Sequence, residues 1–303
     1  MATTDARQRG TGNWGRWGDD DQRGALNLIT PEAVLAATGA CRTGKVYSLA
    51  LPIQRTGVPI LEYRGAPQRL TLTSHLDGAM YEAYGAAPGV GANEDMLILA
   101  SHSITHMDAL SHVYAEGTIY NGYPAEDFKS NSGASRCDIS RTGTFAGRGV
   151  LLDLAGHQGV PWLEPGHVIT ADELEACRAA QGSEMRSGDI LLIRTGWLEQ
   201  FASPDGPDPY AQPGLGYDAV SFVDEHDIAA IGCDNGAIEA IPFDRDVFLG
   251  VHIELLVNRG VTLLEHLVLQ EMAADRCLES LVCVGALPVT GAAGSPINPI
   301  AIG

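Results

Sequence analysis

Basic residues are scarce in this sequence: 19 Lys and Arg stand against 38 Asp and Glu, and the formal net charge is -19 over 303 residues. A field of this sign repels phosphate backbones and anionic lipid. Uncharged apolar runs of the roughly 18–20 residues needed to cross a bilayer are also missing, and residues 1–10 lack the apolar core of a signal peptide. We therefore expect a cytoplasmic protein with a small-molecule substrate and no nucleic-acid or membrane partner.

Paired cysteine motifs are missing as well. The six cysteines are scattered and form no C-x-x-C pair, which excludes a zinc knuckle or a redox dithiol. Buried free thiols are the expectation, because free Cys behaves as a small apolar side chain. The remaining composition, 45% hydrophobic and 19% charged, is ordinary for a globular protein.

Short apolar segments alternate with helical patterns along the chain, which predicts an α/β fold with an at least partly parallel sheet. Strands are expected within residues 45–53, 95–103, 149–156, 188–197, 227–235 and 281–289. Helices are expected from Thr30 to about Ala40, over 170–182, 217–226 and 252–260, and from Leu263 onward. Thr30 before Pro31 is a typical helix start, and Thr170 with Glu173 forms a capping box.

We expect one main domain over residues 45–303, on which a loop and a helix in residues 1–44 pack as an N-terminal extension. The stretches 85–93 and 203–216 are rich in Gly and Pro and are predicted to be long loops. Loops of this length are more often walls of an active site than linkers.

The stretch "SHSITHMDALSH" (101–112) concentrates three histidines and an aspartate. On a straight helix, Asp108 would point away from the face that His102 and His106 share. In a straight strand the two histidines would lie ~13 Å apart at ~3.3 Å per residue, too far for metal–ligand bonds of about 2 Å. If these side chains meet, the backbone must therefore turn between Ser103 and Thr105.

Such a cluster is typical of a catalytic metal site. Imidazole and carboxylate groups suit zinc or manganese, and two His with one Asp leave coordination positions open for water and substrate. The cluster follows the apolar run 95–100, where the end of a strand would present it at a sheet edge.

The stretch resembles the H-x-G-T-H-x-D-x-x-x-H signature of the metal-dependent cyclase family, which includes bacterial kynurenine formamidase and isatin hydrolase. The matching residues are His102, Thr105, His106, Asp108 and His112, while Ile104 stands where the family usually has glycine. Residues 252–267 resemble a second family segment, through His252, Leu255, Leu256, Gly260, Glu265 and Leu267. The Gly- and Pro-rich residues 285–303 resemble the family's C-terminal segment.

This resemblance implies an α/β fold of the swivelling β/β/α type with a mixed sheet, a homodimer or homotetramer, and hydrolysis of an amide or cyclic amide by metal-bound water. It implies that His102, His106 and Asp108 hold Mn²⁺ or Zn²⁺. His252 is expected to join them as a ligand, with one or two ions bound. His112 and Glu265 are the candidates for acid–base catalysis, and either one is alternatively a ligand.

Three further residues are candidates for substrate contacts: His75, on a loop before the cluster, and the pair Trp14 and Trp17. Core packing is an equal alternative for the two tryptophans. The histidines at 157, 167, 226 and 266 lack partners at useful spacing and are expected to be structural or exposed.

Other classes of function fit parts of the pattern. A polyketide-type cyclase would use the ion to stabilise an enolate, and a non-haem iron oxygenase also uses two His and one carboxylate. The oxygenase is disfavoured because the cluster offers more ligands than its triad requires. A non-catalytic metal-binding protein is disfavoured by the open coordination positions.

Overall fold

The computed structural model describes residues 12–204, 206, 208 and 210–303. Its centre is a nine-stranded mixed sheet with the order β1-β15-β13-β7-β9-β11-β12-β4-β14. The strands are β1 (Val46–Ser48), β4 (His106–Asp108), β7 (Thr144–Asp153), β9 (Ile190–Arg194), β11 (Ala230–Cys233), β12 (Thr262–Glu265), β13 (Glu279–Gly285), β14 (Gly294–Pro296) and β15 (Ile300–Ile302). The four consecutive strands β7, β9, β11 and β12 run parallel, and the other pairs in the sheet are antiparallel.

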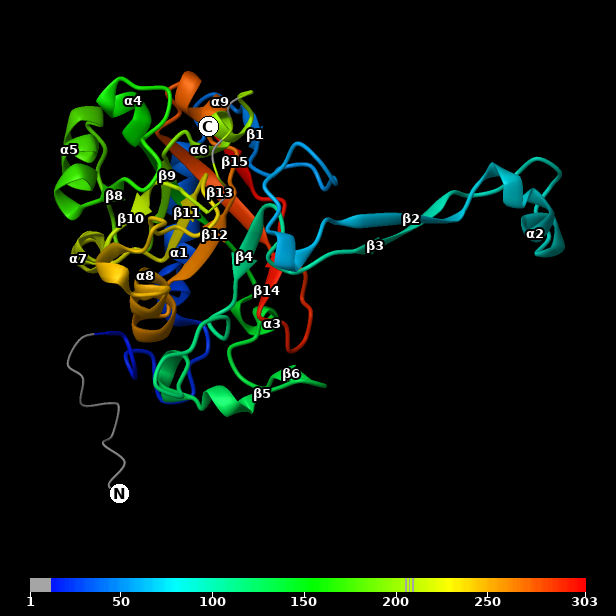
Figure 1. Ribbon diagram of the computed structural model, residues 1–303, viewed down its shortest axis with the longest axis horizontal. Helices are drawn as coiled ribbons and strands as arrows, with labels where there is room; N and C mark the ends of the chain where they lie inside the picture. Colours follow the sequence, from blue (N-terminus) through cyan, green and yellow to red (C-terminus); the bar gives the residue numbers. More distant parts are fainter. Residues whose placement is uncertain (1–11, 205, 207, 209) are drawn as a thin grey trace.

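Helices cover both faces of this sheet (Figure 1). They are α1 (Pro31–Ala37), α3 (Ile139–Thr142), α4 (Leu154–Gln158), α5 (Ala171–Gln181), α6 (Trp197–Phe201), α7 (Val220–Glu225), α8 (Gly250–His252), the π-helix η10 (Ile253–Arg259) and α9 (Gln270–Ala274). Successive β9 residues, such as Leu191 and Leu192, are buried in different core clusters on opposite faces. This two-sided burial explains why the parallel strands are continuously apolar.

Several shorter elements complete the structure. Two-stranded pairs form between β5 (Phe128–Lys129) and β6 (Gly133–Ala134), and between β8 (Val168–Ile169) and β10 (Gly214–Leu215). The 3₁₀ turns include η2 (Gly24–Leu28), η3 (Thr38–Ala40), η4 (Glu62–Arg64), η5 (His75–Asp77), η6 (Tyr120–Gly122), η7 (Ala125–Asp127), η8 (Tyr217–Ala219) and η9 (Asp244–Asp246). No helix of the described residues is long and apolar enough to cross a membrane.

Most of the expected elements are confirmed. The apolar segments at 188–197 and 227–235 contain β9 and β11, and those at 149–156 and 281–289 overlap β7 and β13, which begin earlier than expected. Thr30 caps α1 by accepting from the Ala33 amide. At α5, Thr170 and Glu173 exchange the two bonds of a capping box.

The segment from Leu263 onward was expected to be helical, and this prediction is wrong. The chain first forms β12, whose Leu263 and Leu264 are buried on opposite faces of the sheet. Only residues 270–274 form the helix α9. A short apolar run does not distinguish a strand covered on both faces from a buried helix.

A long hairpin arm leaves the body of the molecule (Figure 1). It consists of β2 (Gln68–Thr73) and β3 (Glu94–Ile98), which pair only with each other in the described structure, and of the distal helix α2 (Gly78–Ala83). The expected strand within 95–103 is therefore a strand of this arm and lies outside the central sheet. The stretch 85–93 belongs to the far part of the arm, so the prediction that it walls the chain's own active site is wrong.

The described part of the N-terminal extension packs on the body. The Asn13 amide donates to the Asn258 carbonyl (2.9 Å), and the Ala25 amide donates to the Gly260 carbonyl (2.8 Å). At the other end of the extension, the Thr43 amide bonds the carbonyl of Gly303 (2.9 Å). Residues 1–11 lie outside the described residues.

Candidate metal centre

A sharp bend follows His102, as the spacing of the cluster requires. Ile104 has φ of 60°, a left-handed conformation that is rare for a β-branched residue. The Ser103 amide donates to the Ala100 carbonyl within this bend (3.2 Å). The bend brings the ring centroids of His102 and His106 to 5.3 Å from each other. The predicted turn between Ser103 and Thr105 is confirmed.

Strand β4 carries the centre of the cluster between two neighbours, β12 and β14. His106 and Asp108 are two residues apart and so lie on the same face of this strand. The sheet register places Glu265 of β12 opposite His106, and the His106 Nε2 lies 2.9 Å from the Glu265 Oε2. The Asp108 Oδ1 lies 3.3 Å from the His102 Nε2. The sheet pairing therefore fixes two carboxylates and the His106 imidazole in one place, and the bend brings the His102 imidazole to them.

His252 enters from α8, at the start of the π-helix η10. Its Nε2 lies 3.4 Å from the Glu265 Oε1 and 3.8 Å from the Asp108 Oδ2. Its other ring nitrogen, Nδ1, is 2.5 Å from the Glu239 Oε1. The Glu239 carboxylate also accepts from the backbone amides of Val251 and His252 (both 3.1 Å). With Nδ1 donating to Glu239, the Nε2 lone pair faces the cluster.

Sequence reasoning missed Glu239, although the carboxylate is buried and orients His252. The two residues are 13 positions apart on separate elements, and no spacing rule connects them. The available signal was its position shortly after the buried parallel strand β11, where α/β proteins collect functional side chains.

His112 is stacked on His102, with ring centroids 3.9 Å apart and planes inclined by 24°. Behind the pair lies Gly294 of β14. A Cβ built on Gly294 would be 2.4 Å from the His102 Nε2, so no other residue fits this position without moving the ring.

Two sets of three possible metal donors result, and they share one carboxylate. His102, Asp108 and His112 form one set, and Asp108, His252 and Glu265 form the other. Within each set, the donor atoms all lie within 4.8 Å of one another. His106 lies between them, because its Nε2 is close to both carboxylates.

Several polar atoms of this cluster are buried without a hydrogen bond. They include the Nε2 atom of His102 and both carboxylate oxygens of Asp108. Leaving such atoms unpaired costs free energy, and a cation removes the cost by coordination. Imidazole nitrogen and carboxylate oxygen suit zinc or manganese, so the residues present fit a divalent ion.

The electrostatics of the cluster lead to the same conclusion. Burial raises the pKa of Asp108. Burial acts in the same direction on Glu265, but bonds and charges from His106 and His252 outweigh it and hold this pKa well below its usual range. Burial lowers the pKa of His252, yet Glu239 and Glu265 outweigh it and raise the value to about 10. Several buried carboxylates therefore require positive charge, which protons or a metal ion can supply.

A cavity of about 390 Å³ opens onto the cluster. Its lining includes four cluster residues, His102, His112, His252 and Glu265. The rest is largely apolar and aromatic, namely Pro59, Leu61, Tyr63, Ile104, Trp197, Tyr210, Ala237, Ile241, Phe243, Phe248 and Leu249, with Arg64, Ser103, Gln212, Gly236 and His266 as further members. A mainly apolar pocket with a few convergent polar groups is typical of a small-molecule site.

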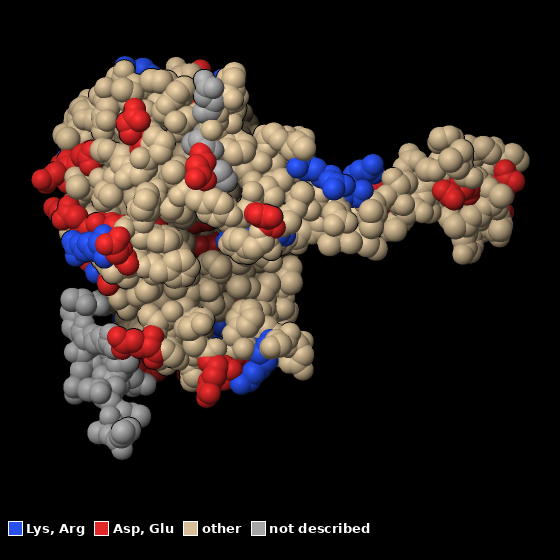
Figure 2. Space-filling view, in the orientation of Figure 1, with Lys and Arg blue, Asp and Glu red and all other residues tan. Residues whose placement is uncertain are grey.

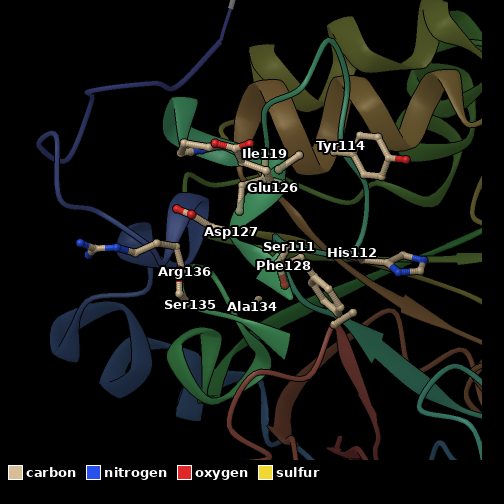
Figure 3. A pocket seen from close by; sticks show the side chains of 13 residues that line it. Ser111, His112, Tyr114, Ile119, Glu126, Asp127, Phe128, Ala134, Ser135 and Arg136 are labelled. Carbon is tan, nitrogen blue, oxygen red and sulfur yellow. The ribbon is translucent and has the colours of Figure 1, made fainter. Parts of the chain in front are cut away.

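A second cavity, of about 490 Å³, lies on another side of His112 (Figure 3). Among the cluster residues it contains only His112, whose imidazole points away from the other lining side chains in the figure. Arg136, Asp127 and Glu126 contribute charge here, and Asp108 is not among the lining residues. The 390 Å³ cavity is therefore the better candidate for the substrate site.

The residues expected to contact substrate do not line that cavity. His75 is exposed and lies on the arm, in η5 next to α2. Trp14 and Trp17 pack against the core, and the Trp14 Nε1 donates to the Val257 carbonyl (2.6 Å). Conversely, His266 was expected to be structural or exposed, and it is buried, stacked on Trp197 and part of the cavity lining.

The chain was compared with protein families, with curated proteins and with solved structures. The model of the Cyclase family matches residues 47–240. A crystal structure described as a novel cyclase is 36% identical, with a TM-score of 0.88 over 97% of this chain and 98% of that chain. No match was found among curated proteins.

More distant structures share the fold. An isatin hydrolase bound to the product analogue thioisatinate is 18% identical, with a TM-score of 0.63 over 90% of this chain and 98% of that chain. A structure described as a predicted metal-dependent hydrolase from Bacillus stearothermophilus is 20% identical, with a TM-score of 0.52 over 85% and 97%. The expected α/β fold with a mixed sheet is confirmed.

Proposed function

The chain belongs to the Cyclase family, and from this premise we propose that it is a metal-dependent hydrolase that cleaves the C–N bond of an amide or cyclic amide. The observation that supports the proposal is the pair of donor sets sharing Asp108 beside an apolar cavity. A formamide, lactam or imide is the expected substrate class, and a lactone fits the same chemistry.

We assign the metal-binding role to His102, His106, Asp108 and His252, with Mn²⁺ or Zn²⁺ as the ion. A divalent ion bound there supplies a Lewis acid for the carbonyl and lowers the pKa of a water molecule toward neutrality. Asp108 is common to both donor sets, so the centre has room for one ion or for two ions that share this carboxylate.

Proton transfer is assigned to His112 and Glu265. Both line the substrate cavity. Burial lowers the pKa of His112, so this imidazole is neutral near pH 7, where it can accept a proton and later return it to the leaving amine. Glu265 contacts His106 and His252 through different oxygens and is an alternative ligand when two ions bind.

The cavity favours a substrate with an aromatic ring. Tyr63, Trp197, Tyr210, Phe243 and Phe248 line it, and aromatic faces pack well on one another. Arg64 lines the same cavity and its guanidinium donates to the His102 carbonyl. Hydrolysis of a cyclic amide produces a carboxylate, and a guanidinium is a suitable partner for it.

The proposal is tested by stripping the protein of metal, reloading it with Mn²⁺ or Zn²⁺ and assaying N-formyl aromatic amines, isatins, imides and lactones. Reloading with metal is expected to restore the hydrolysis of at least one of these four classes of compound. Asp108→Asn should lower bound metal and reduce kcat/KM at least 100-fold, because both donor sets lose the negative charge of the carboxylate that they share. Asp172→Asn, at an exposed position in the first turn of α5, is the matched control and should retain both.

The possible outcomes test the assignment of the metal ligands separately from the proposed hydrolase reaction. Full metal content in Asp108→Asn would contradict the ligand assignment. A metal-loaded protein that cleaves none of these compounds but cyclises an enolisable polyketide would overturn the hydrolase proposal while leaving the metal site intact.

A further inference from the structure

His266 lines the substrate cavity, and the proposed function leaves it without a role. It directly follows β12 and is 5% exposed, with a left-handed φ of 55°. Strained backbone of this kind is concentrated at functional sites. The ring is stacked on Trp197, with centroids 5.8 Å apart and planes inclined by 21°. Its centroid lies 5.9 Å from that of His106, so the imidazole is held beside the candidate metal centre.

The Ile104 carbonyl sets which nitrogen of this ring carries hydrogen. It accepts from the Nδ1 of His266 (3.2 Å) and from the Nδ1 of His106 (2.6 Å). A carbonyl has no proton to donate, so both Nδ1 atoms are the donors. Burial favours the uncharged imidazole, and in this form the Nε2 of His266 is a hydrogen-bond acceptor.

The Nε2 of His266 is open beside Gly236, another residue of the cavity lining. A Cβ built on Gly236 would be 2.5 Å from this nitrogen, so any other residue at this position would cover it. Within the described part of the chain, the Nδ1 contact with Ile104 is the only hydrogen bond of the His266 ring. The structure therefore presents a buried acceptor to the cavity without a donor of its own.

Other polar side chains of the lining are already engaged or carry donors only. The Gln212 amide donates to one backbone carbonyl (3.0 Å) and accepts from one backbone amide (3.1 Å). The Ser103 hydroxyl donates to the Ala100 carbonyl (2.9 Å). Arg64 precedes β2 at the root of the arm, where Figure 2 shows basic side chains, and a guanidinium has no acceptor. The cavity thus combines the donors of Arg64 with the open acceptor of His266.

We propose that the Nε2 of His266 accepts a hydrogen bond from the N–H group of the substrate, so that the cavity selects amides with an N–H over N-alkylated amides and lactones. The choice of an amide rests on the proposed function. The nitrogen of an amide is bonded to the carbonyl carbon that the hydrolase attacks, so an acceptor for its hydrogen has to lie beside the metal centre. His266 lies there.

The same nitrogen disfavours two related classes of compound. A lactone has a ring oxygen in place of the N–H, and the lone pairs of this oxygen would face the lone pair of Nε2. An N-methyl group would occupy the space beside Gly236 and leave Nε2 without a donor. A site built to bond a substrate N–H rejects an analogue that lacks it. Lactones are therefore expected to be poor substrates, although the metal chemistry allows them.

The test compares phthalimide with N-methylphthalimide and with the lactone phthalide, which share a fused aromatic ring. Titration calorimetry of the metal-free full chain measures their Kd values, and assays of the Mn²⁺-loaded or Zn²⁺-loaded chain measure kcat and KM. The unmodified chain is expected to bind phthalimide about tenfold or more tightly than N-methylphthalimide, because the second compound leaves a buried acceptor unpaired.

His266→Phe should abolish this preference, since Phe keeps an aromatic ring beside Trp197 but has no acceptor. Its KM for phthalimide should rise about tenfold, with a smaller change in kcat, because the hydrogen bond forms on binding. Gly236→Ala keeps His266 and should weaken phthalimide binding by covering Nε2. His157→Phe, at an exposed position in α4, is the matched control and should retain the preference.

Equal affinity for phthalimide and N-methylphthalimide, or no binding of either compound, would overturn the proposal. A preference that persists in His266→Phe would equally exclude this residue as the acceptor. Similar rates of phthalimide and phthalide hydrolysis would support the hydrolase function and contradict the selection by His266. An N–H preference in binding without any hydrolysis would contradict the hydrolase proposal and support the role of His266, so the two failures are distinguishable.

Discussion

At the scale of single residues, the centre depends on side chains that hold other side chains. Glu239 fixes the Nδ1 of His252 and the backbone amides around it. Carboxylates in this position set the tautomer and the ring orientation of a metal-binding histidine. Without one, the Nε2 of His252 is not held toward Asp108 and Glu265.

Glu239→Gln is therefore expected to weaken metal binding by about 10–100-fold. An amide can accept from only one of its two terminal atoms, while Glu239 accepts with both oxygens. Titration against a chelator of known affinity measures the change. Glu271→Gln, at an exposed position on α9, provides the comparison, and equal affinities in the two variants would show that Glu239 does not orient the ligand.

The sequence predicted the bend next to His102 in this centre, but it did not predict the role of Glu239. The bend at Ile104 follows from the distance that a straight strand would impose between His102 and His106. Glu239 acts through a contact with His252, which lies on a separate element, α8. Contacts of this kind depend on the packing of the whole domain. A sequence shows the residue types along the chain, but it does not show which distant segments come into contact.

At the scale of elements, the pairing of β4 with β12 and β14 decides the geometry. The register of β14 puts Gly294 beside Asp108, and the absence of a side chain at Gly294 leaves space for the His102 ring. The sheet thus contributes both donor atoms and the room that they need.

Gly294→Ala is expected to displace the His102 ring, because the new Cβ would lie 2.4 Å from Nε2 and 2.9 Å from the Met107 carbonyl oxygen. Metal affinity should fall at least tenfold, which equals about 1.4 kcal/mol. Gly285→Ala in β13 is the control, since a Cβ there meets nothing within 4 Å. Equal metal content and equal metal affinity in the two variants would show that the close approach of Gly294 to the His102 ring does not affect metal binding.

The elements also show where a sequence pattern is ambiguous. The apolar residues of β3 predicted a strand correctly, but burial was assumed because core strands are apolar too. In β3 the same composition lies on an exposed ribbon. Hydrophobic composition alone therefore does not distinguish a strand of the core from a strand on an exposed ribbon.

At the scale of the whole molecule, the proposed metal binding is expected to depend on pH. His252 has its pKa raised to about 10 against an ordinary 6.5. A folded-state pKa above the unfolded value contributes stability that is present below pH 6.5 and is lost as the pH rises toward 10. The Tm of the metal-free protein is therefore expected to fall across this window.

If His252 binds metal as proposed, the ion displaces this proton, so metal affinity should rise with pH over the same window. Melting curves with and without Mn²⁺ or Zn²⁺ between pH 6.5 and 9.5 measure both trends, and the stabilisation by metal should increase. His252→Gln should remove most of the pH dependence. A metal-induced Tm shift that stays constant with pH in the unmodified protein would mean that His252 is not a ligand.

The donors in β4, β12 and α8 are spread along the chain from His102 to Glu265, and the glycine that leaves room for them is near the C-terminal end, in β14. During synthesis, an emerging polypeptide cannot complete this site before β14 has left the ribosome. On the proposed function, the ion is acquired only after β14 has been made, and a prematurely terminated product that ends before β14 is expected to load metal poorly.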